Sequence, residues 1–254
     1  MSQIALITGA SSGIGNASAL KFAAGGYDVI ITGRRVEHLE MLAKKIRGEY
    51  NVDVLPLVFD IRQKREVQQY IGCLQGKWKI IDVLVNNAGL SLGLNPINEG
   101  LDEDWNTMID TNIKGLLYIS QIVMKGMIER KKGHIINIGS IAGIETYSNN
   151  NIYCATKAAV VSITQTMRID LLKYGIKVTL INPGAVETEF SLVRFKGDEQ
   201  SAANVYKGFE PLTGADVADA VYYVSSLPPH VNINELTIVP NAQASPFYSF
   251  KTEI

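Results

Sequence analysis

Short apolar runs alternate along the chain with longer segments that have helical periodicity. The runs are Ile4–Ile7, Val29–Ile31, Val54–Val58, Val83–Val85, Ile135–Ile138, Val178–Ile181 and Leu236–Val239. Most of them lack apolar/polar alternation, which is typical of strands covered on both faces. Helices are expected to start near Gly13, Arg35, Arg62, Asp102, Asn150 and Thr213, and the one from Asp102 extends to about Glu129. This alternation predicts an α/β fold, a doubly wound parallel sheet with helices on both faces.

The segment from Gly184 to about Pro211 breaks the alternation. It has no clean strand, and its aromatic residues are interleaved with basic ones: Phe190, Phe195 and Phe209 with Arg194, Lys196 and Lys207. A long irregular segment in a compact domain is typically a lid or binding loop, and a mobile surface excursion is the alternative. We find no linker or internal repeat, so we expect a single domain over residues 1–254 with a substrate loop at about 184–211.

Composition excludes several classes of partner. Hydrophobic residues make up 46% of the 254 residues, charged residues 19%, and the formal net charge is −1. This is a globular composition without long-range attraction for nucleic acid or anionic membranes. The first apolar run lacks the features of a signal peptide, and no run approaches the ~18 residues of a membrane span.

The cysteines and histidines show no ligand spacing. Cys73 and Cys154 fit neither a disulfide framework nor a zinc pattern, and His38, His134 and His230 are isolated. We therefore expect no metal and a reducing compartment, the cytoplasm.

A glycine-rich turn follows the first predicted strand. Residues Thr8-Gly9-Ala10-Ser11-Ser12-Gly13-Ile14-Gly15 lead from that strand into a helix. Glycines allow a tight turn there and let backbone N–H groups approach a pyrophosphate at the positive end of the helix. The spacing differs from Gly-x-Gly-x-x-Gly, and strand–helix corners need glycine anyway. Its place at the end of strand one nevertheless favours dinucleotide binding.

Two arginines follow the second predicted strand. Sites for NAD usually have an acidic residue here that holds the ribose 2′-hydroxyl. This chain has Arg34 and Arg35 instead, and the first carboxylate after them is Glu37. A guanidinium can bind a 2′-phosphate through two parallel hydrogen bonds. The alternative is that both arginines simply begin an exposed helix. We predict NADP as the cofactor in preference to NAD.

Three residues have the arrangement of an acid–base site. Tyr153 and Lys157 lie four apart at the start of a predicted helix and therefore share one face, and Ser140 ends the preceding strand. A free tyrosine has a pKa of about 10, and lowering it by about three units needs roughly 4 kcal/mol of differential stabilisation. The Lys157 ammonium together with the charge of a nicotinamide could supply that in a desolvated cleft.

Over almost its whole length the chain resembles the short-chain dehydrogenases/reductases. The matching motifs are Thr8-Gly9-x-x-x-Gly13-x-Gly15, Asp60, Asn86-Asn87-Ala88-Gly89, Asn112, Ser140, Tyr153-x-x-x-Lys157 and Pro183-Gly184. Each is modest alone, but together and in this order they are highly specific. The resemblance implies a Rossmann-type sheet of seven parallel strands in the order 3-2-1-4-5-6-7.

The resemblance also implies residue roles. Tyr153 would be the general acid in reduction and the base in oxidation, and Ser140 would polarise the substrate oxygen. Lys157 would lower the pKa of Tyr153 and bind the nicotinamide ribose, and Asn112 would hold a water. The cofactor-binding residues expected are Gly9, Ser11, Ser12, Gly13, Ile14, Gly15, Arg34, Arg35, Asp60 (at the adenine), Ile61, Asn87, Ala88, Gly89, Tyr153, Lys157, Pro183, Gly184, and Val186 and Thr188 (at the carboxamide).

A narrower resemblance lies in the second half of the chain. Residues 188–198 (TEFSLVRFKGD) and 227–234 (LPPHVNIN) resemble the NADP-dependent 3-hydroxy acid dehydrogenases, which oxidise serine, allo-threonine and related acids. The carboxylate of such a substrate needs a cation beyond Ser140 and Tyr153. We predict that Arg194 binds it, with Lys196 as the weaker candidate. A solvated Arg194, or one that contacts another subunit, is the alternative.

Two other functions remain open at this point. One is a reductase of the same fold for a bulkier ketone, a sugar or an acyl thioester, in which case Arg194, Lys196 and Lys207 could face an acyl-carrier partner. The other is a non-catalytic dinucleotide sensor, which would need none of the acid–base residues. The family resemblance further implies a homotetramer in which the long helix from Asp102 and the helix with Tyr153 pack against symmetry mates.

Overall fold

A computed structural model describes residues 2–252 and contains one seven-stranded sheet, in which every neighbouring pair of strands is parallel. The strands are β1 (Ile4–Thr8), β2 (Asp28–Gly33), β3 (Val54–Val58), β4 (Val83–Asn86), β5 (His134–Ile138), β6 (Lys177–Pro183) and β7 (Glu235–Ile238). Their order is β3-β2-β1-β4-β5-β6-β7, which confirms the predicted fold class and strand order.

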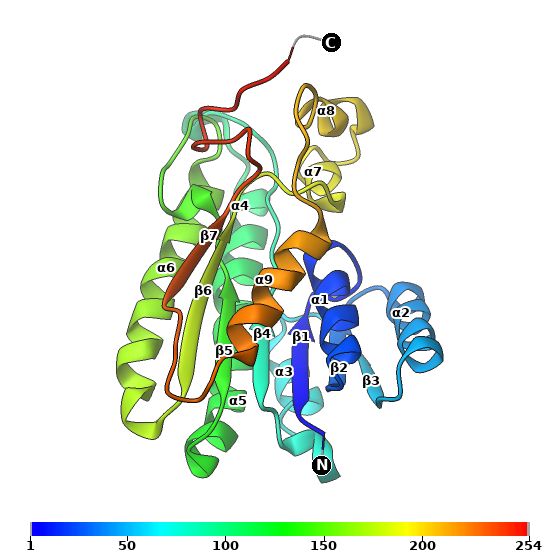
Figure 1. Cartoon of the computed structure of the whole chain (residues 1–254). Coiled ribbons are helices and arrows are strands. Elements are labelled where there is room, and N and C mark those ends of the chain that lie inside the picture. The colour runs from blue at the N-terminus through cyan, green and yellow to red at the C-terminus, as the bar shows by residue number, and fades with distance from the viewer. Residues whose placement is uncertain (1, 253–254) are drawn as a thin grey trace.

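Helices cover both faces of this sheet (Figure 1). On one face lie α1 (Gly13–Ala24), α2 (Val36–Glu49) and α9 (Gly214–Ser226), and on the other α3 (Lys64–Tyr70), α5 (Leu116–Arg130) and α6 (Asn151–Leu171). Successive residues of β1 alternate between the two cores: Ala5 and Ile7 face the first set of helices, and Ile4 and Leu6 face the second. Because both faces of the strand are buried, its sequence shows no polar alternation.

The long helix predicted from Asp102 is observed, but it contains an irregular turn. Helix α4 (Asp102–Ile109) passes through a π-helical turn, η3 (Asp110–Gly115), into α5. Short 3₁₀ turns lie at η1 (Gly76–Lys79), η2 (Ile97–Glu99), η4 (Ile141–Gly143) and η5 (Leu172–Tyr174). Single π turns inside α-helices often occur at functional sites, and this one carries Asn112.

The segment after β6 lies beyond the carboxyl ends of the strands. It contains two short helices that the sequence pattern did not predict, α7 (Glu189–Arg194) and α8 (Glu199–Asn204). Figure 1 shows them at the same end of the molecule as the segment that follows β7. A parallel β-bridge between Val186 and Leu212 holds the two ends of this segment side by side. Within residues 2–252, no helix is both long and apolar enough to cross a membrane.

Candidate active site

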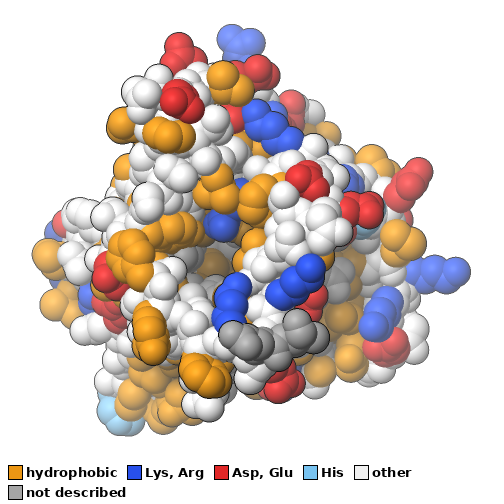
Figure 2. All heavy atoms as spheres, turned by 90° about the horizontal axis from the view of Figure 1, so that it is seen from above, with side chains coloured by type: hydrophobic (Ala, Val, Ile, Leu, Met, Phe, Trp, Pro, Cys, Tyr) orange, Lys and Arg blue, Asp and Glu red, His pale blue; other side chains and the backbone are white. Residues whose placement is uncertain are grey.

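A cavity of about 710 Å³ opens at the carboxyl end of the sheet. Figure 2 looks onto this end and shows a hollow rimmed by hydrophobic side chains, with Lys and Arg side chains among them. The predicted site residues that line it are Gly9, Ser11, Ser12, Gly13, Ile14, Arg34, Arg35, Asp60, Ile61, Asn87, Ala88, Gly89, Ser140, Tyr153, Lys157, Pro183, Gly184, Val186, Thr188 and Arg194. Gly15 and Asn112 are not part of the lining but lie directly behind it.

The turn after β1 is built for a close approach of backbone to ligand. Gly9 and Gly13 have φ of +66° and +53°, a region that residues with a Cβ rarely adopt. The amide of Asn87 donates from Nδ2 to the carbonyl oxygens of Thr8 (2.9 Å) and Gly9 (3.2 Å) and fixes the turn. A Cβ on Gly15 would collide with Gly9, so this glycine allows α1 to pack closely on the turn.

Helix α1 begins at this turn without a side-chain cap. Ser12 occupies the N-cap position, but its side chain makes no capping hydrogen bond. The first N–H groups of a helix need acceptors, and the positive end of the helix dipole favours an anion there. The residues present therefore fit a dinucleotide pyrophosphate at this end of the cavity.

The basic pair after β2 lines the cavity. Arg34 is exposed and lines the cavity. The Nε and Nη2 of Arg35 donate to the hydroxyl of Ser11 at 3.3 and 3.1 Å. Asp60 accepts hydrogen bonds from the Arg62 side chain with both carboxylate oxygens, at 2.6–3.0 Å. Those bonds and the charge of Arg62 hold the pKa of the Asp60 carboxyl below its usual value, although burial opposes the shift.

Ser140, Tyr153 and Lys157 come from neighbouring elements and meet at the cavity wall. Ser140 lies just beyond the end of β5, where its Oγ accepts a hydrogen bond from the backbone N–H of Ala142 at 3.1 Å. Tyr153 and Lys157 lie on the first turns of α6, and both are buried. The Lys157 Nζ donates to the carbonyl of Ile138 at 2.8 Å and is 5.9 Å from the centroid of the Tyr153 ring.

Burial dominates the electrostatics of this group. Desolvation raises the pKa of Tyr153 to about 12, although the charge of Arg194 and a hydrogen bond with Ser140 lower it. Desolvation also lowers the pKa of Lys157 to about 8. The sequence predicted that Lys157 lowers the pKa of Tyr153. In the protein alone, the groups that lower this pKa are Arg194 and Ser140, and the penalty of burying a phenolate is larger. Burial therefore keeps Tyr153 protonated at neutral pH in the protein alone.

Asn112 organises the cavity wall from behind. Its side chain is 2% exposed and pairs with both backbone groups of Leu90: Oδ1 accepts from the N–H and Nδ2 donates to the carbonyl, each at 2.9 Å. Nδ2 also donates to the Thr156 hydroxyl at 3.0 Å. The side chain thus ties the turn after β4 to α6. Its predicted role of holding a water remains a prediction.

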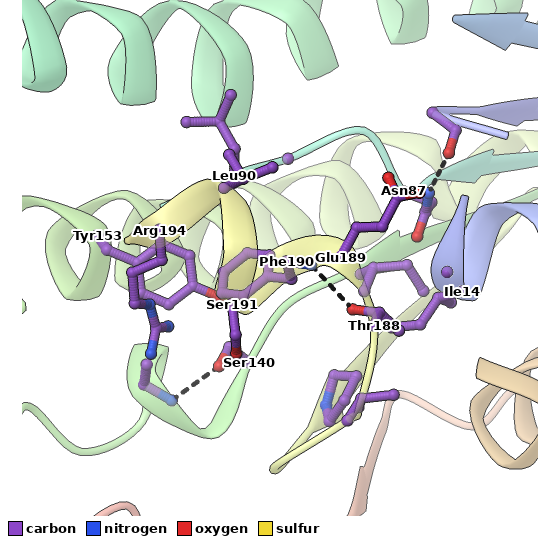
Figure 3. A pocket seen from close by; sticks show the side chains of 18 of the residues that line it. Ile14, Asn87, Leu90, Ser140, Tyr153, Thr188, Glu189, Phe190, Ser191 and Arg194 are labelled. Atoms are coloured by element: carbon purple, nitrogen blue, oxygen red, sulfur yellow. Dashed lines mark hydrogen bonds between the residues drawn. The ribbon is translucent and has the colours of Figure 1, made fainter. Parts of the chain in front are cut away.

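Arg194 is partly buried and lies over the ring of Tyr153. The centre of its guanidinium is 5.6 Å from the centroid of the Tyr153 ring and 4.9 Å from that of Phe190 (Figure 3). Its Nε is buried and has no hydrogen-bond partner within residues 2–252. Lys196 differs, because it pairs with Asp104 at 2.8 Å and does not line the cavity. Of the two candidates for a carboxylate clamp, the geometry favours Arg194.

The sequence motifs did not indicate part of the lining. Gln243, Pro246, Phe247, Ser249 and Lys251 after β7 form one wall, and Tyr206 and Phe209 after α8 form another. No motif marks the positions after β7, whereas Tyr206 and Phe209 lie in the predicted substrate loop, where Phe209 was singled out. The aromatic residues near the end of the chain were the one available signal. Phe195, which we grouped with Phe190 and Phe209, does not line the cavity.

Comparison with known proteins identifies relatives along the whole chain. A family model described as short chain dehydrogenase matches residues 3–198. The chain is 46% identical over 242 residues to the NADP-dependent 3-hydroxy acid dehydrogenase YdfG of Escherichia coli strain K12, covering 95% of this chain and 96% of the relative. It is 43% identical over 245 residues to sulfoacetaldehyde reductase 2 of Chromohalobacter salexigens, covering 96% of each.

A solved structure is similar as well. The closed form of serine dehydrogenase complexed with NADP⁺ superposes with a TM-score of 0.93 at 43% identity and covers 99% of this chain and 100% of that one.

Proposed function

The chain belongs to the short-chain dehydrogenase family, and from this we propose that it transfers a hydride between NADP(H) and the hydroxyl or carbonyl group of a small 3-hydroxy acid such as serine or allo-threonine. The observation that carries the substrate class is Arg194, a cation whose buried Nε has no partner among the described residues and which lies over the ring of Tyr153. Relatives named for 3-hydroxy acids and serine support it.

The dinucleotide would lie along the turn after β1. Gly9, Gly13 and the uncapped start of α1 would hold the pyrophosphate, Arg34 and Arg35 the 2′-phosphate, and Asp60 the adenine. Bound NADP supplies the hydride acceptor in oxidation, the hydride donor in reduction and, when oxidised, a positive charge near Tyr153. The remaining chemistry belongs to the side chains of this protein.

The proton moves through Tyr153. In reduction the phenol donates its proton to the carbonyl oxygen of the substrate while the carbonyl carbon gains the hydride; oxidation reverses both transfers. Ser140 would hold the substrate oxygen beside the Tyr153 hydroxyl. Lys157 would bind the nicotinamide ribose, and its charge would add to that of Arg194 in stabilising the phenolate.

Arg194 would orient the acid. One carbon atom separates the carboxylate of a 3-hydroxy acid from the reacting carbon, so a cation beside Tyr153 is close enough to bind the carboxylate. A guanidinium can bind the carboxylate with two parallel hydrogen bonds. Phe190 covers one side of that cation and excludes water, which strengthens the pairing.

A second candidate function shares this geometry. A small aldehyde with a sulfonate group would place its anion at Arg194 in the same way, and the relative named sulfoacetaldehyde reductase supports this reading. An acyl thioester has less support, because Lys196, one of the three basic residues suggested for an acyl-carrier partner, is paired with Asp104.

A substrate panel tests the proposal. Serine, allo-threonine, 3-hydroxypropionate, 2-hydroxyethanesulfonate and an uncharged secondary alcohol would be oxidised with NADP and NAD in parallel. We expect the highest kcat/KM for a 3-hydroxy acid with NADP. A preference for the sulfonate would favour the second candidate, and a preference for the uncharged alcohol would contradict both.

We further propose a cytoplasmic homotetramer that forms through α4, α5 and α6. Large apolar side chains on or next to α5 and α6 support this assembly: Leu117, Ile169 and Leu172 are 39%, 74% and 73% exposed. Light scattering coupled to size-exclusion chromatography tests it, and a monomer at micromolar concentration would contradict it.

A further inference from the structure

An ion pair across the cavity joins the residue after β2 to the start of α7. Nη1 of Arg35, which follows β2, lies 2.8 Å from Oε2 of Glu189, the first residue of α7. The other edge of the same guanidinium holds Ser11, with its Nη2 donating to the Ser11 carbonyl at 3.3 Å as well as to the hydroxyl. The start of the substrate segment is therefore tied to the cation that we assign to the cofactor.

Glu189 is an unexpected neighbour for a phosphate site. Two acidic side chains, Asp60 and Glu189, occur in the cavity lining that the structure describes. Both oxygens of Asp60 are engaged by Arg62, whereas the Glu189 carboxylate faces Arg35. The side chains of the Arg35–Glu189 pair are 41% and 44% exposed, so solvent screens the pair and its own contribution to folding is small.

We propose that Glu189 is a cofactor-specificity determinant that competes with the 2′-phosphate of NADP for Arg35. The proposal rests on the proposed function, in which Arg34 and Arg35 bind that phosphate. The phosphate carries nearly two negative charges, so a carboxylate on the same guanidinium repels it and occupies one of its donors. NAD has a hydroxyl at this position and does not experience that repulsion. Glu189 therefore narrows the preference for NADP over NAD.

The competition can be measured without turnover. Adenosine 2′,5′-bisphosphate carries the 2′-phosphate, and adenosine 5′-monophosphate lacks it. The dissociation constants of both would be measured by calorimetry for the unmodified protein, Glu189→Gln and Glu187→Gln. The last is a matched control, because Glu187 is an exposed glutamate two residues away that does not line the cavity. Glutamine keeps the size of the side chain and removes its charge.

We expect Glu189→Gln to bind the bisphosphate about fivefold more tightly, which is about 1 kcal/mol. Binding of the monophosphate should be unchanged, and Glu187→Gln should change neither. The gain should shrink at 0.5 M salt, because partly exposed charges are screened. In an Arg35→Ala background, Glu189→Gln should have a smaller effect, because one shared partner is gone.

Three results would overturn the proposal. Unchanged bisphosphate binding in Glu189→Gln would mean that the carboxylate does not compete. Weaker binding would mean that Glu189 instead holds Arg35 in place for the phosphate. Equal affinity of the unmodified protein for both probes would show that the assignment of the 2′-phosphate site is wrong, a failure of the proposed function and not of Glu189 alone.

Discussion

Replacing Arg194 with Met gives the sharpest test of the substrate clamp. Methionine preserves an unbranched apolar stem against Phe190 and Tyr153 but removes the guanidinium. A hydrogen bond to a charged group is worth about 1.5–3 kcal/mol, and a carboxylate would make two to this side chain. Because such bonds are not additive, we expect kcat/KM for serine or 3-hydroxypropionate to fall by about 10²–10³, or roughly 3–4 kcal/mol.

Arg194→Met should also cause a smaller loss of kcat/KM for every substrate. The charge of Arg194 lowers the pKa of Tyr153, so its removal makes the phenolate harder to form. Oxidation of an uncharged secondary alcohol should therefore slow as well, by less than about tenfold. The decisive quantity is the ratio of the two losses, measured by steady-state kinetics at one pH with saturating NADP.

Two further variants separate charge from geometry. Arg194→Lys keeps the charge but loses the planar pair of donors. The kcat/KM for the acid substrates should therefore lie between those of the unmodified enzyme and Arg194→Met. Lys196→Met removes a cation two residues away that is paired with Asp104, and both substrate classes should stay within about twofold of the unmodified enzyme. Equal losses on charged and uncharged substrates in Arg194→Met would refute the clamp and leave the substrate class resting on similarity alone.

Four other outcomes are expected. Tyr153→Phe should lower kcat by about 10²–10⁴ while NADP, followed by fluorescence, still binds. Because the pKa of Tyr153 is raised to about 12, reduction should be flat from about pH 6 to 8, whereas oxidation, which needs the phenolate, should rise with pH. Replacing Arg34 and Arg35 with Ala should weaken the binding of NADP tenfold or more in a direct binding assay and leave the affinity for NAD nearly unchanged. Burial lowers the pKa of His134 from 6.5 to about 3, so the unfolded chain binds a proton below about pH 6.5 that the folded chain does not. The free energy of unfolding should then decrease as the pH is lowered below about 6.5, by up to about 1.4 kcal/mol per pH unit. His134→Gln, which can keep the hydrogen bond to Thr179, should remove this contribution in urea titrations at pH 5 and 7.

The strands and most helices were predictable because burial determines their composition. Runs such as Ile4–Ile7 are covered on both faces, and helices as long as α6 repeat their apolar positions for several turns. Helices α7 and α8 have only six residues each, too few for a periodic signal. The π turn at Asp110–Gly115 leaves the overall helical pattern of the segment intact, so periodicity could not reveal it.

Part of the candidate site was likewise predictable from the sequence, and part was not. Its glycine turn, Ser140, Tyr153 and Lys157 sit at fixed spacings on regular elements, and the structure places them around one cavity. The wall after β7 and the pairing of Lys196 with Asp104 depend on contacts between distant segments, which local sequence does not encode. The protonation of Tyr153 is a similar case, because a pKa depends on how deeply the fold buries the group.

Helix α7 shows what only the three-dimensional arrangement supplies. Its first residue, Glu189, contacts the arginine assigned to the cofactor, and its last, Arg194, lies over Tyr153 where the substrate is expected. Five residues of helical rise separate the two by about 8 Å along the axis, so one short rigid element reaches both halves of the cavity. A shift of this helix would change both contacts together.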